Sequence, residues 1–134
     1  MVISEAAIKS WTPSILGVLR IIIGFLFLQH GTAKLLGMPH VAMFDNLQLF
    51  SLIGLAGVLE LVGGLLVLIG LFTRITAFIL SGEMAFAYFI AHAPHALLPI
   101  LNNGELAVLY CFVFLYLAFA GAGEYSVDAA RKKA

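Results

Sequence analysis

The sequence has little charge and almost no cysteine. Of its 134 residues only 10% are Asp, Glu, Lys or Arg, against about a quarter in ordinary soluble domains. Seven basic residues cancel seven acidic ones, so there is no basic excess to neutralise phosphates, and nucleic-acid binding is excluded. The single cysteine, Cys111, has no partner for an intrachain disulfide, a CxxC redox couple or a thiolate metal site. Thiol–disulfide chemistry within this chain is therefore excluded too.

Apolar residues dominate the composition. They account for 63% of the chain, and the mean hydropathy is +1.10. A helix that crosses a bilayer needs about 20 mainly apolar residues. Four stretches meet this requirement: residues 12–35, 49–71, 73–92 and 104–120. We therefore predict an all-α fold, a transmembrane four-helix bundle that forms a single domain over residues 1–134 and has the lipid bilayer as its surroundings.

Basic residues near the ends of the predicted spans indicate the orientation of the bundle. With four spans, both termini lie on the same side of the membrane. The opposite side carries Lys34 alone. The side of the termini carries the other basic residues near span ends, which are Lys9, Arg74, Arg131, Lys132 and Lys133. Because cytoplasmic loops are enriched in Lys and Arg, we predict that both termini are cytoplasmic.

Three ionisable residues fall well inside the predicted spans: Arg20, Glu60 and Glu83. Each costs about 2.5–3.5 kcal/mol at mid-membrane on insertion scales, so all three should face the interior of the bundle. Glycines share a helical face with Arg20 in the first span and with Glu60 in the second, and such faces let neighbouring backbones approach closely. These glycines are Gly17, Gly24 and Gly31, and Gly57 and Gly64.

We therefore predict that Arg20 and Glu60 form a buried ion pair between the first two spans. The pair is either a structural feature that fixes helix register or a part of a ligand site. Glu83 has two interpretations of its own. It is either a protonated carboxyl group bonded to a neighbouring carbonyl or a proton-carrying group.

A second set of polar residues reaches similar depth near the predicted outer surface. It comprises His30, Lys34, His92 and Glu105, and it could bind an anion or a quinone headgroup or relay protons. The alternative treats each residue separately. Lys34 would then extend to the surface, His92 and His95 would cap a helix end, and Glu105 would complement the positive end of the fourth helix.

The sequence predicts no metal site. It has no HxxxH or ExxH pair within a predicted helix, and the spacing from His92 to His95 includes Pro94, which breaks the regular turn. His30 and His92 on different helices could in principle ligate haem, which is a weaker alternative. Cys111 lies among aromatic residues and is interpreted as a buried packing residue.

Taken in order, these residues resemble the DoxX family of small four-helix membrane proteins over nearly the whole chain. The resemblance rests on Leu19-Arg20 with Gly24, His30-Gly31-x-x-Lys34-Leu35, Glu60-Leu61-x-Gly63-Gly64, Gly70-Leu71-x-Thr73-Arg74, Asn103-Gly104-Glu105, Gly121 and Ser126-Val127-Asp128.

The resemblance implies a multi-pass protein of the bacterial cytoplasmic (inner) membrane. It also points to relatives that are subunits of a thiosulfate:quinone oxidoreductase or of a membrane-associated oxidoreductase assembly. The recurring polar positions of the family correspond to Arg20, His30, Lys34, Glu60 and Glu105, while Glu83 and His92 belong to a narrower version of the pattern. This chain departs from a redox enzyme in having no paired cysteines, no clear cofactor motif and no soluble catalytic domain.

The leading prediction is a protein that binds a quinone or similar small lipophilic molecule near the outer surface, as the membrane subunit of a redox system with protein partners. His30 or Lys34 would donate to a headgroup carbonyl and Glu105 would handle a proton. One alternative is a non-catalytic scaffold or assembly factor for partner proteins, and another is a small proton-coupled transporter. The sequence assigns no catalytic residue, leaves open whether the protein is an enzyme, and allows a homo-oligomer.

Overall fold

The computed structural model describes residues 3–134, and this part of the chain is helical with no strand. The prediction of an all-α fold is therefore confirmed. The elements are α1 (Glu5–Leu36), the 3₁₀ turn η1 (Ala42–Phe44), α2 (Leu52–Ile69), α3 (Thr73–Ala87), the π-helical turn η2 (Tyr88–His92), α4 (Pro99–Asn102), α5 (Glu105–Ala120) and α6 (Val127–Lys133).

The first helix begins earlier than the sequence predicts. The predicted first span begins at residue 12, but α1 runs from Glu5 and continues through Pro13. Ser4 caps it instead, because its hydroxyl oxygen accepts the Ala7 N–H at 3.2 Å and so satisfies one of the unpaired donors of the first turn. The Thr12 hydroxyl donates to a carbonyl of the preceding turn rather than capping the helix. At the other end α1 stops at Gly37, whose φ of 66° is left-handed.

Three segments within residues 3–134 are long and apolar enough to cross a membrane: Glu5–Leu36, Leu52–Ile69 and Thr73–His92. Helix α5 is also apolar but, with 16 residues, it is shorter than these. Many large apolar side chains point outward from these helices, and their exposure suits contact with lipid tails. Examples are Phe78, Phe89, Phe112 and Phe119, which are 62–76% exposed.

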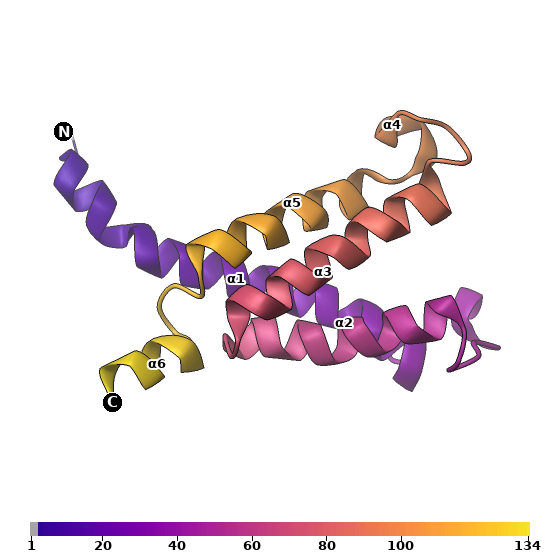
Figure 1. The fold of residues 1–134 in the computed structure, drawn as a ribbon, viewed down its shortest axis with the longest axis horizontal. Helices are drawn as coiled ribbons and strands as arrows, with labels where there is room; N and C mark the ends of the chain where they lie inside the picture. The colour runs from indigo at the N-terminus through magenta and orange to yellow at the C-terminus, as the bar shows by residue number, and fades with distance from the viewer. Residues whose placement is uncertain (1–2) are drawn as a thin grey trace.

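The long helices are arranged as two pairs, α1 against α2 and α3 against α5. Figure 1 shows that α2 and α3 leave a short turn at Gly70 and then diverge, so that their far ends are separated. The start of α1, the α2–α3 turn, the end of α5 and α6 all lie toward one end of the molecule, and α4 lies toward the other (Figure 1).

Glycines let the backbones of α1 and α2 touch, as the sequence predicts. A Cβ added at Gly24 would lie 2.6 Å from the backbone nitrogen of Leu68, and one added at Gly64 would lie 2.8 Å from Cα of Leu28. At Gly31 the added atom would collide with the backbone of Leu61. Larger residues at these positions would therefore force the helices apart.

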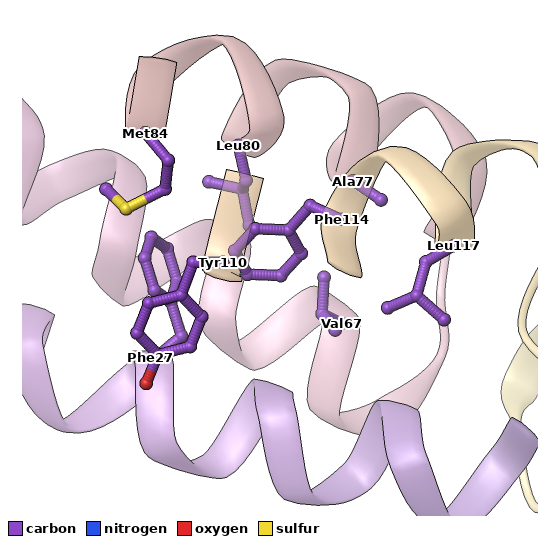
Figure 2. Close-up of a cluster of buried hydrophobic side chains, with 8 residues drawn as sticks. All are labelled: Phe27, Val67, Ala77, Leu80, Met84, Tyr110, Phe114 and Leu117. Carbon is purple, nitrogen blue, oxygen red and sulfur yellow. The ribbon is translucent and has the colours of Figure 1, made fainter. Parts of the chain in front are cut away.

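A single apolar core joins all four long helices. Phe27 of α1 packs against Phe114 and Tyr110 of α5, with ring centroids 4.8 and 5.1 Å apart in edge-on geometry, which is a favoured arrangement of aromatic pairs. Figure 2 shows this cluster between the helices. Its buried members are Phe27, Val67, Ala77, Leu80, Met84, Tyr110, Phe114 and Leu117.

Candidate functional site

Arg20 is fully buried and satisfies its whole guanidinium group with main-chain oxygens. An arginine side chain has five N–H donors, and all of them are used at distances of 2.5–3.2 Å. Nε donates to Ala122, Nη1 to Val67 and Leu68, and Nη2 to Glu124 and Tyr125. The residue therefore joins the end of α2 to the segment that follows α5.

The prediction of an Arg20–Glu60 ion pair is wrong. Arg20 lies level with the last turn of α2, about two helical turns beyond Glu60. At that level the final carbonyls of α2 have no partner within the helix and carry the negative end of its dipole. Backbone oxygens thus stabilise the buried cation, and a carboxylate is not needed.

The segment after α5 is also tied to the turn between α2 and α3. The carboxylate of Asp128 accepts the backbone N–H groups of Phe72 and Thr73 at 3.0 and 2.9 Å, and the N–H of Asp128 donates to the Gly70 carbonyl at 2.8 Å. Burial by itself raises the pKa of Asp128, but the hydrogen bonds from Thr73 and Phe72 and the nearby Arg131 outweigh it and hold the pKa below its ordinary value.

Glu60 pairs with Lys34 across the contact between α1 and α2. The Nζ atom of Lys34 lies 2.7 and 2.6 Å from the two carboxylate oxygens, and the two side chains are only 13% and 4% exposed. Gly57 provides the space, because a Cβ there would lie 3.1 Å from Cβ of Lys34. Removing either partner would leave the other as a buried charge without compensation.

Glu83 lies on α3, across from this pair. Both of its carboxyl oxygens are shielded from solvent, and neither finds a hydrogen-bond partner among the residues that the structure describes. The hydrogen bond to a neighbouring carbonyl, one of its two sequence interpretations, is therefore not formed. Buried polar atoms without a partner are uncommon in folded proteins, so the Glu83 carboxyl group is a candidate for contact with a ligand.

These three residues line one pocket. It has a volume of about 510 Å³ and lies between α2 and α3, where the helices diverge from their turn (Figure 1). Lys34, Glu60 and Glu83 are its only charged lining residues within residues 3–134. Its walls are otherwise apolar and include Ile53, Leu59, Ile79 and Phe86. The arrangement can accept a largely apolar molecule that carries a few polar atoms at one point.

The residues of the predicted outer set lie in different surroundings. Lys34 is engaged with Glu60, one helical turn after His30. His30 packs edge-on against the ring of Tyr110 at 6.0 Å. The other two members lie on either side of α4. His92 is in η2, where its Nδ1 is 2.9 Å from the carbonyl oxygen of Asn102, and Glu105 is exposed in the first turn of α5. A ligand-binding role for these residues stays a prediction.

Comparisons with known proteins agree with the membrane character of the chain. The DoxX family model matches residues 15–93. A Haemophilus influenzae protein named "Uncharacterized protein" is 44% identical over 130 residues, which cover 90% of this chain and 93% of the relative. A Bacillus subtilis protein named "Putative oxidoreductase CatD" is 30% identical over 117 residues, covering 82% of this chain and 81% of the relative. No solved structure matches.

Proposed function

This chain belongs to the DoxX family of membrane proteins, and from that premise we propose that it binds a quinone, or a similarly small lipophilic molecule, as the membrane subunit of an oxidoreductase system. The observation that carries the proposal is the apolar pocket between α2 and α3, whose polar groups are the Lys34–Glu60 pair and the unpartnered Glu83 carboxyl group. The name of the Bacillus subtilis relative supports the redox part.

The pocket suits such a molecule in size and chemistry. Its volume of about 510 Å³ lies within the range of about 300–1,000 Å³ that is typical of small-molecule sites. The ammonium group of Lys34 has three N–H donors, of which Glu60 takes two, so one is left for a ring carbonyl. Glu83 offers a second polar contact on the opposite wall. The apolar side chains between α2 and α3 would surround the ring and its tail.

In the proposed topology α5 is the fourth membrane span. Its 16 residues extend roughly 24 Å at 1.5 Å per residue, and apart from Glu105 at its first position it contains no charged residue. It contributes Tyr110, Phe114 and Leu117 to the core that the other spans share. Four spans place both termini on one side, and the basic residues near that side favour the cytoplasm. The proposed location is the bacterial cytoplasmic membrane.

The direct experiment fills the pocket from a position where a side chain fits. Gly82 lines the pocket, and a Cβ added there meets no atom within 4 Å in the described part of the chain. Gly82→Leu should therefore extend into the pocket without disturbing the fold, and Gly82→Ala is the matched control that leaves most of the volume free. We expect the leucine variant in nanodiscs to lose binding of short-chain ubiquinone and menaquinone, measured by equilibrium dialysis, and the alanine variant to keep it.

Three other outcomes would count against the proposal. If Gly82→Leu binds both quinones as tightly as the unmodified protein, the pocket is not the site. If the unmodified protein binds neither quinone but retains a partner protein after crosslinking in native membranes, the scaffold alternative replaces quinone binding. Proton flux into liposomes that disappears in Glu83→Gln would instead favour the transporter.

A further inference from the structure

We propose a second binding site, at the end of the bundle where α3 begins and α5 ends, that holds the phosphate headgroup of an anionic phospholipid. A pocket of about 660 Å³ lies there, lined by the start of α3, residues 120–124 and α6. It is separate from the pocket between α2 and α3, because no residue lines both. The proposal does not depend on quinone binding.

Three cationic side chains line this pocket: Arg74, Arg131 and Lys132. Two acidic residues also line it, but both already have partners. Asp128 uses its two carboxylate oxygens for the backbone N–H groups at the start of α3, and a carboxylate oxygen of Glu124 lies 3.7 Å from the Lys133 ammonium group. With three basic and two acidic side chains, the lining keeps a net charge of +1 for a ligand.

Arg74 is held in place by backbone contacts before any ligand arrives. Its Nη1 donates to the carbonyls of Ala118 and Phe119 in the last turn of α5, where unpaired carbonyls favour a cation. Glycine at position 121 gives the guanidinium group room, because a Cβ there would lie 3.1 Å from Nη2. Within residues 3–134 the hydrogen bonds of this side chain involve Nη1 only, so Nε and Nη2 can donate to a phosphate, for which arginine geometry is well suited.

The side of the pocket formed by Arg131 combines positive charge with apolar surface. The Arg131 guanidinium carbon lies 5.5 Å from the centre of the Phe72 ring, which is within the range of a cation–π contact. Phe72 and Ile75 line the same pocket and are 54% and 65% exposed. A ligand at this place therefore meets basic groups and hydrocarbon together, which fits a phospholipid better than free phosphate.

The position in the fold also fits a lipid headgroup. The pocket lies where α2 and α5 end and α3 begins, toward the end of the molecule that carries both termini (Figure 1). The ends of spanning helices lie at the level of the lipid headgroups. Anionic lipids there attract basic residues with an energy that corresponds to roughly fivefold in affinity for each Lys or Arg.

Native mass spectrometry in detergent tests the proposal with mixed phosphatidylglycerol and phosphatidylcholine as probes. We expect the unmodified protein to prefer phosphatidylglycerol, Lys132→Gln to lower that preference roughly fivefold, and a variant that also carries Arg131→Gln to lower it roughly 30-fold. Lys9→Gln is the matched control. It removes the same charge from an exposed residue that pairs with Glu5 at 2.9 Å and does not line the pocket, so it should leave the preference unchanged.

The thermal stability of each variant is measured in parallel. It should stay close to the unmodified value, because both α6 side chains are exposed and an exposed cation–π contact such as that of Arg131 contributes little. An unchanged lipid preference in the double variant would overturn the proposal. So would an equal loss in Lys9→Gln, which would mean that only total charge matters. Inorganic phosphate is added in a separate arm: displacement of phosphatidylglycerol by phosphate alone would assign the pocket to a free anion instead of a lipid.

Discussion

The Lys34–Glu60 ion pair allows a quantitative prediction through a double-mutant cycle. Lys34→Met keeps an unbranched side chain of similar length but leaves the Glu60 carboxylate, which is 4% exposed, without its counter-charge. Glu60→Gln leaves the Lys34 ammonium group, which is 13% exposed, in the same position. The double variant removes both charges.

Each single variant should be strongly destabilised, by about 3–5 kcal/mol, because breaking a buried ion pair leaves one uncompensated charge. The double variant has no buried charge at this point, so its loss should be smaller than either single loss. The two single effects should therefore be far from additive, with a coupling of at least about 3 kcal/mol between the side chains.

The assay is reversible unfolding in mixed detergent micelles, followed by circular dichroism as the fraction of denaturing detergent rises. The exposed pair of Lys9 and Glu5, whose side chains are 74% and 83% exposed, provides the control. Lys9→Met, Glu5→Gln and the variant that carries both changes should each leave the free energy of unfolding almost unchanged. Additive losses at Lys34 and Glu60, or losses no larger than those of the exposed pair, would refute the reasoning.

Three further predictions concern the packing and the C-terminal segment. Arg20→Lys keeps the charge but offers three N–H donors to five carbonyls. The melting temperature in detergent should therefore fall in this variant, and it should fall further in Arg20→Met. Equal melting temperatures in the unmodified protein and the two variants would contradict this. Gly31→Ala should lower the melting temperature, because the added Cβ meets the backbone of Leu61. Gly82→Ala has open space around the added Cβ, so helix propensity should raise its free energy of unfolding by up to about 1 kcal/mol. The opposite order would be evidence against the close contact at Gly31. The pKa of Asp128 is lowered in the folded protein. Its contribution to stability is therefore complete above the unfolded pKa of about 3.9 and is lost as the pH falls through the folded pKa. Between pH 7 and pH 3 the melting temperature should therefore fall less in Asp128→Asn than in the unmodified protein.

Composition and spacing were sufficient to predict the helical class and the close helix contacts. Glycines a heptad apart, at Gly24 and Gly31, indicate a face where backbones touch, and the structure places them against Leu68 and Leu61. The burial of Arg20 and Glu60 also follows from their place in apolar spans, and both are buried. These features depend on local sequence, which fixes which face of a helix must be covered.

The partners of the buried charges could not be predicted in the same way. The oxygens that bind Arg20 belong to the backbone, which every residue has, so no side-chain pattern marks them. Lys34 is close to a predicted span end, where extension toward the surface is the ordinary outcome, and only the approach of α1 to α2 at Gly31 and Gly57 brings it to Glu60. The pocket beside Glu83 depends on the divergence of α2 from α3, a tertiary property.

The hydrogen bonds of Arg20 have a consequence for how the protein is made. The residue is synthesised more than 100 residues before three of its five acceptors, which belong to residues 122–125. During insertion the first helix therefore carries a cation whose final partners do not yet exist. Synthesis of residues 122–125 is then the step that completes the hydrogen bonds of α1, and a protein shortened before residue 122 would keep α1 to α5 while leaving Nε and Nη2 of Arg20 without acceptors.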